Sequence, residues 1–309
     1  MTTRMTSEAL LREQHMRQRR ADRFRPYLIL APAFLLTIGI LIPFFFAVYL
    51  SFTDISLRSP NYDLVGVTNY VQMFTNPDFW HAVSVTLRYA LWTTGIELVL
   101  GLGVALLLNE DSRFTTVMRL LLTFPLMVAP VIATLIWQLM TSPSVGIVAN
   151  WLRALGLGDF QWGAATGSAM FSVVIIDVWV YTPFVIILVL AGLRSLPADP
   201  YEAASIDGAR PITMFLRLTL PMIMPFLLIA LIFRLMLSLQ EFGIIFALTK
   251  GGPGDTLVGM SLYGYQQGFQ FYDLAKSIPV MFILYLVVYL AANVLINSWR
   301  RAQTHAAGE

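Results

Sequence analysis

The chain has 309 residues, of which 57% are hydrophobic and 12% charged, about half of the ~25% charged residues of a typical soluble domain. With a mean hydropathy of +0.71, this composition excludes a soluble globular protein and predicts an integral protein of the lipid bilayer. A net charge of only +2 supplies no basic field for phosphates, so nucleic acid is not expected as a partner. The absence of cysteine excludes disulfides, thiolate metal sites and cysteine nucleophiles.

Six apolar segments have the length of a transmembrane helix, which needs about 20 residues. They cover residues 27–52, 84–108, 120–140, 169–193, 219–248 and 277–297. We therefore expect an all-α membrane protein with six transmembrane helices within residues 27–298. A basic tail, residues 1–26, precedes this domain, and a short tail, residues 299–309, follows it.

Positive charge is unevenly divided between the two sides of these spans. Fourteen arginines precede the first span or follow the second, fourth and sixth, against five arginines and lysines on the other side. Because positive residues concentrate in cytoplasmic loops, both termini are predicted to be cytoplasmic. The basic residues of the first tail either set this topology or hold the tail along the anionic inner leaflet. The longest loops have about 30 residues, fewer than the ~40 that an independent catalytic domain needs.

The cytoplasmic loop between the fourth and fifth spans, residues 199–221, has an unusual pattern. A short helix is expected around Glu202, a turn at Gly208, and a second short helix from Pro211, because proline is favoured in the first turn of a helix. The loop also carries the acidic residue Asp207 and the basic residues Arg210 and Arg217. Such a compact projection is suited to a groove on another protein.

At this loop the chain resembles the permease subunits of ATP-binding-cassette (ABC) importers. Their signature is Glu-Ala-Ala, three residues, Gly, nine residues, an aliphatic residue, one residue and Leu-Pro. The matching residues here are Glu202, Ala203, Ala204, Gly208, Leu218, Leu220 and Pro221. The stretches DVWVYTPF (residues 177–184) and ALTKGGPGDT (residues 247–256) resemble the sugar branch of the family, the maltose-type and glycerol-phosphate-type permeases. Leu218 stands where the family often has isoleucine.

The resemblance implies a type I ABC importer permease in the cytoplasmic (inner) membrane of a bacterium or archaeon. The expected partners are a second homologous permease, two cytoplasmic ATP-binding subunits and an extracytoplasmic substrate-binding protein. The residues implied in coupling to the ATPase are Glu202, Ala203, Ala204, Asp207 and Gly208, with Glu202 pairing to an arginine there. This chain has no Gly-x4-Gly-Lys-Ser/Thr phosphate loop, so ATP and Mg are expected on the partners. We expect no cofactor, metal or enzymatic activity in this chain.

Polar residues within the spans are candidates for substrate contact, because charges there usually face a cavity. Arg234, Leu237, Ser238 and Glu241 are spaced to share one helical face, and Asp177, Tyr181 and Phe184 share another. The resemblance implies sugar contacts at Trp179, Tyr181, Phe184, Arg234, Leu237, Ser238 and Glu241. The alternative is that Arg234 and Glu241 pair with the partner permease. Glu97 is expected to be a polar residue of helix packing.

Other functions agree less well with the sequence. An importer for a non-sugar solute would share the cytoplasmic loop but generally not the two sugar-type stretches. An ion-coupled secondary transporter would use Asp177 or Glu97 as a proton site, but no internal repeat is present. A membrane-embedded enzyme lacks a nucleophile and a metal site, because the three histidines are scattered: His15, His81 and His305.

Overall fold

The computed structural model describes residues 27, 30–59, 61–156 and 160–306, so the predicted tail, residues 1–26, lies outside the described residues. The described residues are almost entirely helical and form no β-strand beyond two isolated bridges. Together with the apolar character of the long helices, this confirms the predicted class, an all-α membrane protein.

Five helices of the described chain are long and apolar enough to cross a membrane. They are the N-terminal helix Leu30–Leu50, α3 (Pro77–Leu107), α7 (Thr166–Arg194), the continuous helix Pro211–Leu239 and α13 (Leu274–Ala306). The helix Pro211–Leu239 comprises α9 (Pro211–Met214), a π-helical turn at Phe215–Thr219 and α10 (Leu220–Leu239). The last span thus begins before the predicted residue 277 and continues into the predicted tail.

The third predicted span, residues 120–140, is not a straight helix. It consists of α4 (Arg113–Thr123) with a 3-10 turn at Phe124–Met127, followed by α5 (Pro130–Met140), and the two halves meet at 101°. The bend follows from proline chemistry, because the residue before a proline is forced towards extended backbone. Ala129 has a ψ of 135° directly before Pro130. Counting this bent pair as one span gives the predicted six.

The fifth predicted span, residues 219–248, is also interrupted. α10 ends at Leu239, and a separate helix, α11, covers Gly243–Thr249. Between them the Glu241 carboxylate accepts a hydrogen bond from the Ile244 N–H at 2.7 Å. This bond satisfies one of the free N–H groups at the start of α11. The prediction that Glu241 continues the helical face of Arg234 is therefore wrong.

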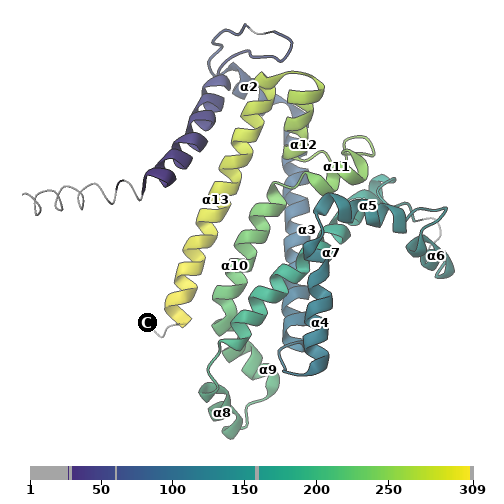
Figure 1. The fold of residues 1–309 in the computed structure, drawn as a ribbon, viewed down its shortest axis with the longest axis vertical. Coiled ribbons are helices and arrows are strands. Elements are labelled where there is room, and N and C mark those ends of the chain that lie inside the picture. The colour runs from purple at the N-terminus through teal and green to yellow at the C-terminus, as the bar shows by residue number, and fades with distance from the viewer. Residues whose placement is uncertain (1–26, 28–29, 60, 157–159, 307–309) are drawn as a thin grey trace, which may run out of the picture.

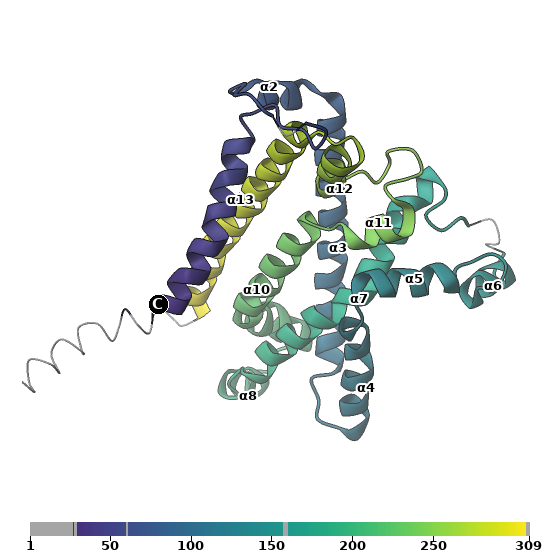
Figure 2. The same cartoon turned by 45° about the horizontal axis from the view of Figure 1, so that its top comes forward.

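Four of the long helices, α3, α7, α10 and α13, pack together, and the N-terminal helix lies outside them (Figures 1 and 2). α3 lies along α7, and α10 contacts α3, α7 and α13. α3 approaches α7 closely at Gly101, where an added Cβ would be 2.5 Å from Val185 Cγ1. Small residues allow such close packing between membrane helices. This packing fixes the three helices that carry the polar residues of the spans.

The short helices lie at the two ends of the bundle and at its side (Figure 1). One end carries α8 (Asp199–Ile206) and α9, and the opposite end carries α2 (Thr68–Thr75) and α12 (Met260–Tyr265). A π-helical turn at Gln266–Gln270 connects α12 towards α13, and α6 (Ile147–Ala154) extends to the side beyond α5. The N-terminal helix lies beside α13. The two helices are in contact at Phe44 and Tyr285, whose ring centres are 5.5 Å apart.

Candidate functional site

A guanidinium group and two carboxyl groups meet in the middle of the bundle. Arg234 of α10 donates from Nε to Glu97 Oε2 at 2.5 Å and from Nη2 to Glu97 Oε1 at 2.8 Å. Its Nη2 also donates to Asp177 Oδ1. All three side chains are fully buried. Because a buried charge is costly unless it is paired, this charge cluster (Arg234, Glu97 and Asp177) holds α10 against α3 and α7.

Neighbouring polar and aromatic groups complete the charge cluster. The Tyr89 hydroxyl donates to Asp177 Oδ2 at 2.6 Å, and Arg234 Nη2 donates to Ser238 Oγ at 3.1 Å. The Tyr181 ring centre lies 4.0 Å from the Arg234 Cζ, a cation–π geometry. Arg234 Nη1 is buried and has no hydrogen-bond partner among the described residues. The positive charge of Arg234 is thus compensated within this chain by the carboxyl groups of Glu97 and Asp177.

The structure places the predicted substrate residues in three settings. Arg234 belongs to the charge cluster, and Ser238 and Tyr181 contact it. Leu237 is half exposed, and Glu241 caps α11. The third group consists of aromatic residues of α7. Trp179 is 38% exposed, and Phe184 packs edge-to-face against Phe233 at 6.0 Å. The contact of these seven residues with a substrate stays a prediction.

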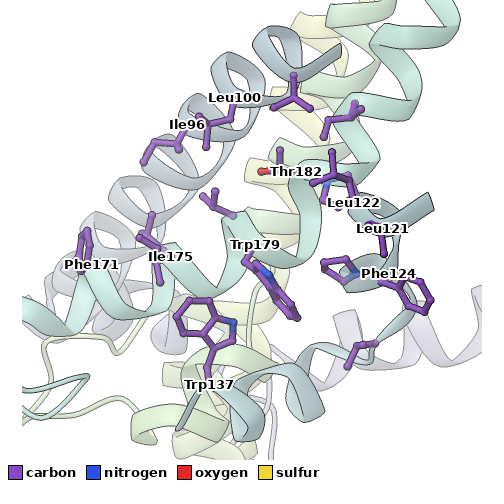
Figure 3. A pocket seen from close by; sticks show the side chains of 17 residues that line it. Ile96, Leu100, Leu121, Leu122, Phe124, Trp137, Phe171, Ile175, Trp179 and Thr182 are labelled. Atoms are coloured by element: carbon purple, nitrogen blue, oxygen red, sulfur yellow. The ribbon is translucent and has the colours of Figure 1, made fainter. Parts of the chain in front are cut away.

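A large apolar cavity, which we call the inner cavity, lies between α3, α7 and the bent third span (Figure 3). Its volume is about 700 Å³, and its lining is almost entirely aliphatic and aromatic. Trp137 of α5 meets Trp179 of α7 with ring centres 6.0 Å apart and planes at 77°. Thr182 is among the lining residues, and its hydroxyl oxygen is buried without a hydrogen-bond partner among the described residues. Apolar ring faces with a few polar groups are typical of small-molecule sites.

Trp137 and Tyr89 were missed in the sequence analysis. Both lie in apolar spans, where an aromatic side chain most often belongs to ordinary packing. Trp137 is three residues before the end of its predicted span, where the preference of tryptophan for span ends points to a membrane anchor and not to a ligand site. Tyr89 lies far from Asp177 in the sequence, and no local pattern connects the two residues.

The α8–α9 segment projects from the end of the bundle, as predicted (Figure 1). Glu202, Ala203, Asp207 and Gly208 are exposed, and Ala204 is half-buried. Gly208 has a φ of +69°, a conformation that favours glycine, and so allows the reversal between the two helices. The Tyr201 hydroxyl donates to Thr219 Oγ1 at 3.0 Å. This bond connects α8 to the base of α10, the helix that carries Arg234.

These features define a multi-pass membrane protein with an exposed helical projection, which is joined to the helix that carries the charge cluster. The chain belongs to the family of binding-protein-dependent transport system inner membrane components, whose model matches residues 97–306. It is therefore a membrane subunit of an ABC importer, as the sequence predicted.

Several proteins of this type are similar to the chain over most of its length. The trehalose/maltose transport system permease protein MalF of Thermococcus litoralis is 35% identical, covering 78% of this chain and 82% of that protein. The sulfoquinovosyl glycerol permease protein SmoG of Agrobacterium fabrum is 34% identical, covering 85% and 86%. The sn-glycerol-3-phosphate permease protein UgpA of Pectobacterium atrosepticum is 32% identical, covering 85% and 90%.

The fold is that of solved ABC importers. A chain of a bacterial ABC transporter that imports the acidic polysaccharide alginate matches with a TM-score of 0.79 at 22% identity, covering 92% of this chain and 98% of that chain. A chain of the MetNI methionine ABC transporter matches with a TM-score of 0.53 at 17% identity, covering 76% and 98%. At these identities the likeness shows the fold alone.

Proposed function

We propose that this chain forms half of the translocation pathway of a carbohydrate importer in the cytoplasmic membrane of a bacterium or archaeon. A second permease forms the other half, two cytoplasmic subunits bind ATP and Mg, and an extracytoplasmic protein delivers the sugar. The names of the relatives MalF, SmoG and UgpA support a sugar, a polyol or a derivative of these. The alternatives are a non-sugar solute or, against the family match, ion-coupled transport.

The observation that carries this proposal is the connection from the exposed α8–α9 segment to the charge cluster. The ATPase subunit binds α8 through Glu202 and moves it when ATP binds. The Tyr201–Thr219 hydrogen bond and the continuous helix Pro211–Leu239 carry this movement to Arg234. Because Arg234 holds α3 and α7, the three helices shift together and open the pathway to the side where the sugar arrives.

The distribution of charge supports an uncharged carbohydrate. Arg234 is buried between two carboxyl groups, so it offers no net positive field to an anion. The inner cavity has no charged side chain in its lining. Trp137 and Trp179 there provide apolar faces for the C–H surfaces of a sugar ring. We therefore expect uptake of neutral sugars such as trehalose or maltose rather than glycerol-3-phosphate.

Purification of the tagged chain in mild detergent tests the proposal. A phosphate-loop ATPase and a second permease are expected to co-purify. The variant Glu202→Ala is expected to weaken this association or to hydrolyse ATP without uptake. Glu110→Ala is the matched control, because Glu110 is an exposed acid in the loop between α3 and α4. A chain that purifies alone and transports without ATP would overturn the proposal and favour an ion-coupled transporter.

A further inference from the structure

A second cavity, of about 740 Å³, lies beyond the bent third span and has a different lining; we call it the outer cavity. Its walls are the end of α5, the turn after α5, the segment before α7 and Leu248 of α11. The polar and aromatic side chains in its lining are Gln138, Thr141, Ser142, Phe160, Gln161 and Trp162. By the positive-charge asymmetry, this region faces the side opposite to the α8–α9 segment.

The chemistry of this lining is that of a sugar site. Amide groups of Gln138 and Gln161 both donate and accept hydrogen bonds, as sugar hydroxyls do. Phe160 and Trp162, with ring centres 5.1 Å apart, offer apolar faces for the C–H side of a sugar ring. The Trp162 Nε1 is buried and has no hydrogen-bond partner among the described residues. A buried indole N–H normally has an acceptor, and a sugar hydroxyl is suitable.

The segment that carries Trp162 is held in place by hydrogen bonds. The Gly163 N–H donates to Ser172 Oγ of α7 at 3.0 Å, and the Ser168 hydroxyl donates to the Gln161 carbonyl oxygen. Gly163 has a φ of +65°, and a Cβ there would be only 3.0 Å from Thr249 Cγ2. The close approach to α11 and the left-handed backbone therefore both require glycine. The outer cavity is thus built from fixed walls.

Aromatic rings connect this cavity to the inner one. The Trp162 ring centre lies 5.8 Å from that of Trp137, and Trp137 meets Trp179 at 6.0 Å. Trp162 lines the outer cavity, whereas Trp137 and Trp179 line the inner cavity (Figure 3). A sugar ring leaving Trp162 therefore meets a further apolar face without crossing charged side chains.

We propose that the outer cavity is a carbohydrate subsite that receives the sugar at Trp162 before it passes along Trp137 to the inner cavity. This inference rests on the proposed function, because it assigns one step of the same import. Sequence periodicity gave no sign of it, since the walls come from three separate segments of the chain.

The test uses the complete importer, with its binding protein, in proteoliposomes. Uptake of labelled trehalose, maltose and glycerol-3-phosphate identifies the substrate of the wild type, and the variants are measured with that substrate. Trp162→Ala is expected to lower uptake about 2- to 10-fold, the range of one aromatic contact. Trp162→Phe, which keeps a ring but loses the N–H, is expected to fall between it and the wild type. Gln161→Ala, which leaves the ring in place, is expected to lower uptake as well.

Trp151→Ala is the matched control, because Trp151 is a 65% exposed tryptophan of α6 that lines neither cavity. It is expected to match the wild type. If Trp162→Ala, Trp162→Phe and Gln161→Ala all behave like this control, the subsite is disproved while the proposed function stands. If Trp162→Ala weakens docking of the binding protein by the same factor as uptake, the region is a protein interface instead. Uptake by the wild type that does not require ATP would contradict the proposed function itself, so this failure is distinguishable from failure of the subsite.

Discussion

At the scale of single residues, the main finding is that the intramembrane charges are paired within the chain. Glu97 and Arg234 are 137 positions apart, yet they make two hydrogen bonds. Hydropathy and spacing identify both as unusual residues in apolar spans. They cannot predict the pairing, because it depends on how three distant helices pack. The alternative that Arg234 and Glu241 pair with the partner permease stays a prediction.

Removing the cation of the charge cluster is expected to be strongly destabilising. In Arg234→Ala, Glu97 and Asp177 are left buried together without a positive partner, which costs about 3–5 kcal/mol. The measurement is the thermal unfolding of the purified importer. Arg88→Ala is the control, since Arg88 is exposed on α3 and its loss is expected to change stability by less than ~0.5 kcal/mol. Equal melting temperatures for the two variants would contradict a structural role of the cluster.

Tyr89→Phe tests the contribution of the hydroxyl that the sequence analysis missed. The variant keeps the ring but removes the donor to Asp177, so a loss of about 1–2 kcal/mol is expected. Tyr285→Phe removes a hydroxyl from a half-exposed ring of α13 and is expected to have no measurable effect. Both are compared by unfolding of the purified complex. An unchanged Tyr89→Phe variant would contradict a stabilising role of this hydrogen bond.

At the scale of elements, hydropathy predicted the number of spans better than their shape. Pro125 and Pro130 in the third span signalled a break, but not its angle of 101°. The end of α10 at Leu239 has no proline to signal it. There the carboxylate of Glu241 accepts a hydrogen bond from the first turn of the next helix. A hydropathy profile cannot predict this break, because the residues on both sides of it are apolar. The α8–Gly208–α9 segment was predictable because its signals are local: helix formers, a glycine and a proline.

Gly208→Ala tests whether the shape of the α8–α9 segment matters for coupling. Alanine at a φ of +69° is strained, at a cost of about 1 kcal/mol or more, so the turn is expected to change and ATP hydrolysis to proceed with less uptake. Gly254→Ala is the matched control, with a φ of +62° and the same open space around its Cβ, in the loop before α12. The ratio of sugar taken up to ATP hydrolysed should fall only in Gly208→Ala. A fall in both variants would indicate a general defect.

Two glycines of α3 test how close packing against α7 contributes to stability. Gly101→Ala places a Cβ 2.5 Å from Val185 Cγ1, so the helices must move apart, at a cost of about 1–3 kcal/mol. Gly103→Ala, with nothing within 4 Å of its Cβ, is expected to be neutral. Thermal unfolding distinguishes the two variants. The double variant Gly101→Ala with Val185→Ala is expected to recover part of the loss.

At the scale of the whole molecule, the absence of cysteine allows a direct test of orientation. Ser205→Cys places a thiol on exposed α8, and Gln72→Cys places one on exposed α2 at the opposite end. In intact cells or spheroplasts, a membrane-impermeant maleimide is expected to label only Gln72→Cys, because the arginine distribution puts α8 in the cytoplasm. After lysis both variants should react. The reverse pattern would invert the proposed direction of transport.

The charge cluster also has a consequence for the biogenesis of the protein. Glu97 and Asp177 are synthesised before Arg234, and each carboxylate costs about 2.5–3.5 kcal/mol at the centre of an isolated span. α3 is the least apolar of the five single spans. The buried carboxylate therefore makes the membrane insertion of α3 less favourable than that of the other spans. The early helices therefore gain their full stability in the lipid only when α10 arrives with its guanidinium. Loss of Arg234 is then a defect of insertion as well as of stability, visible as less protein in the membrane.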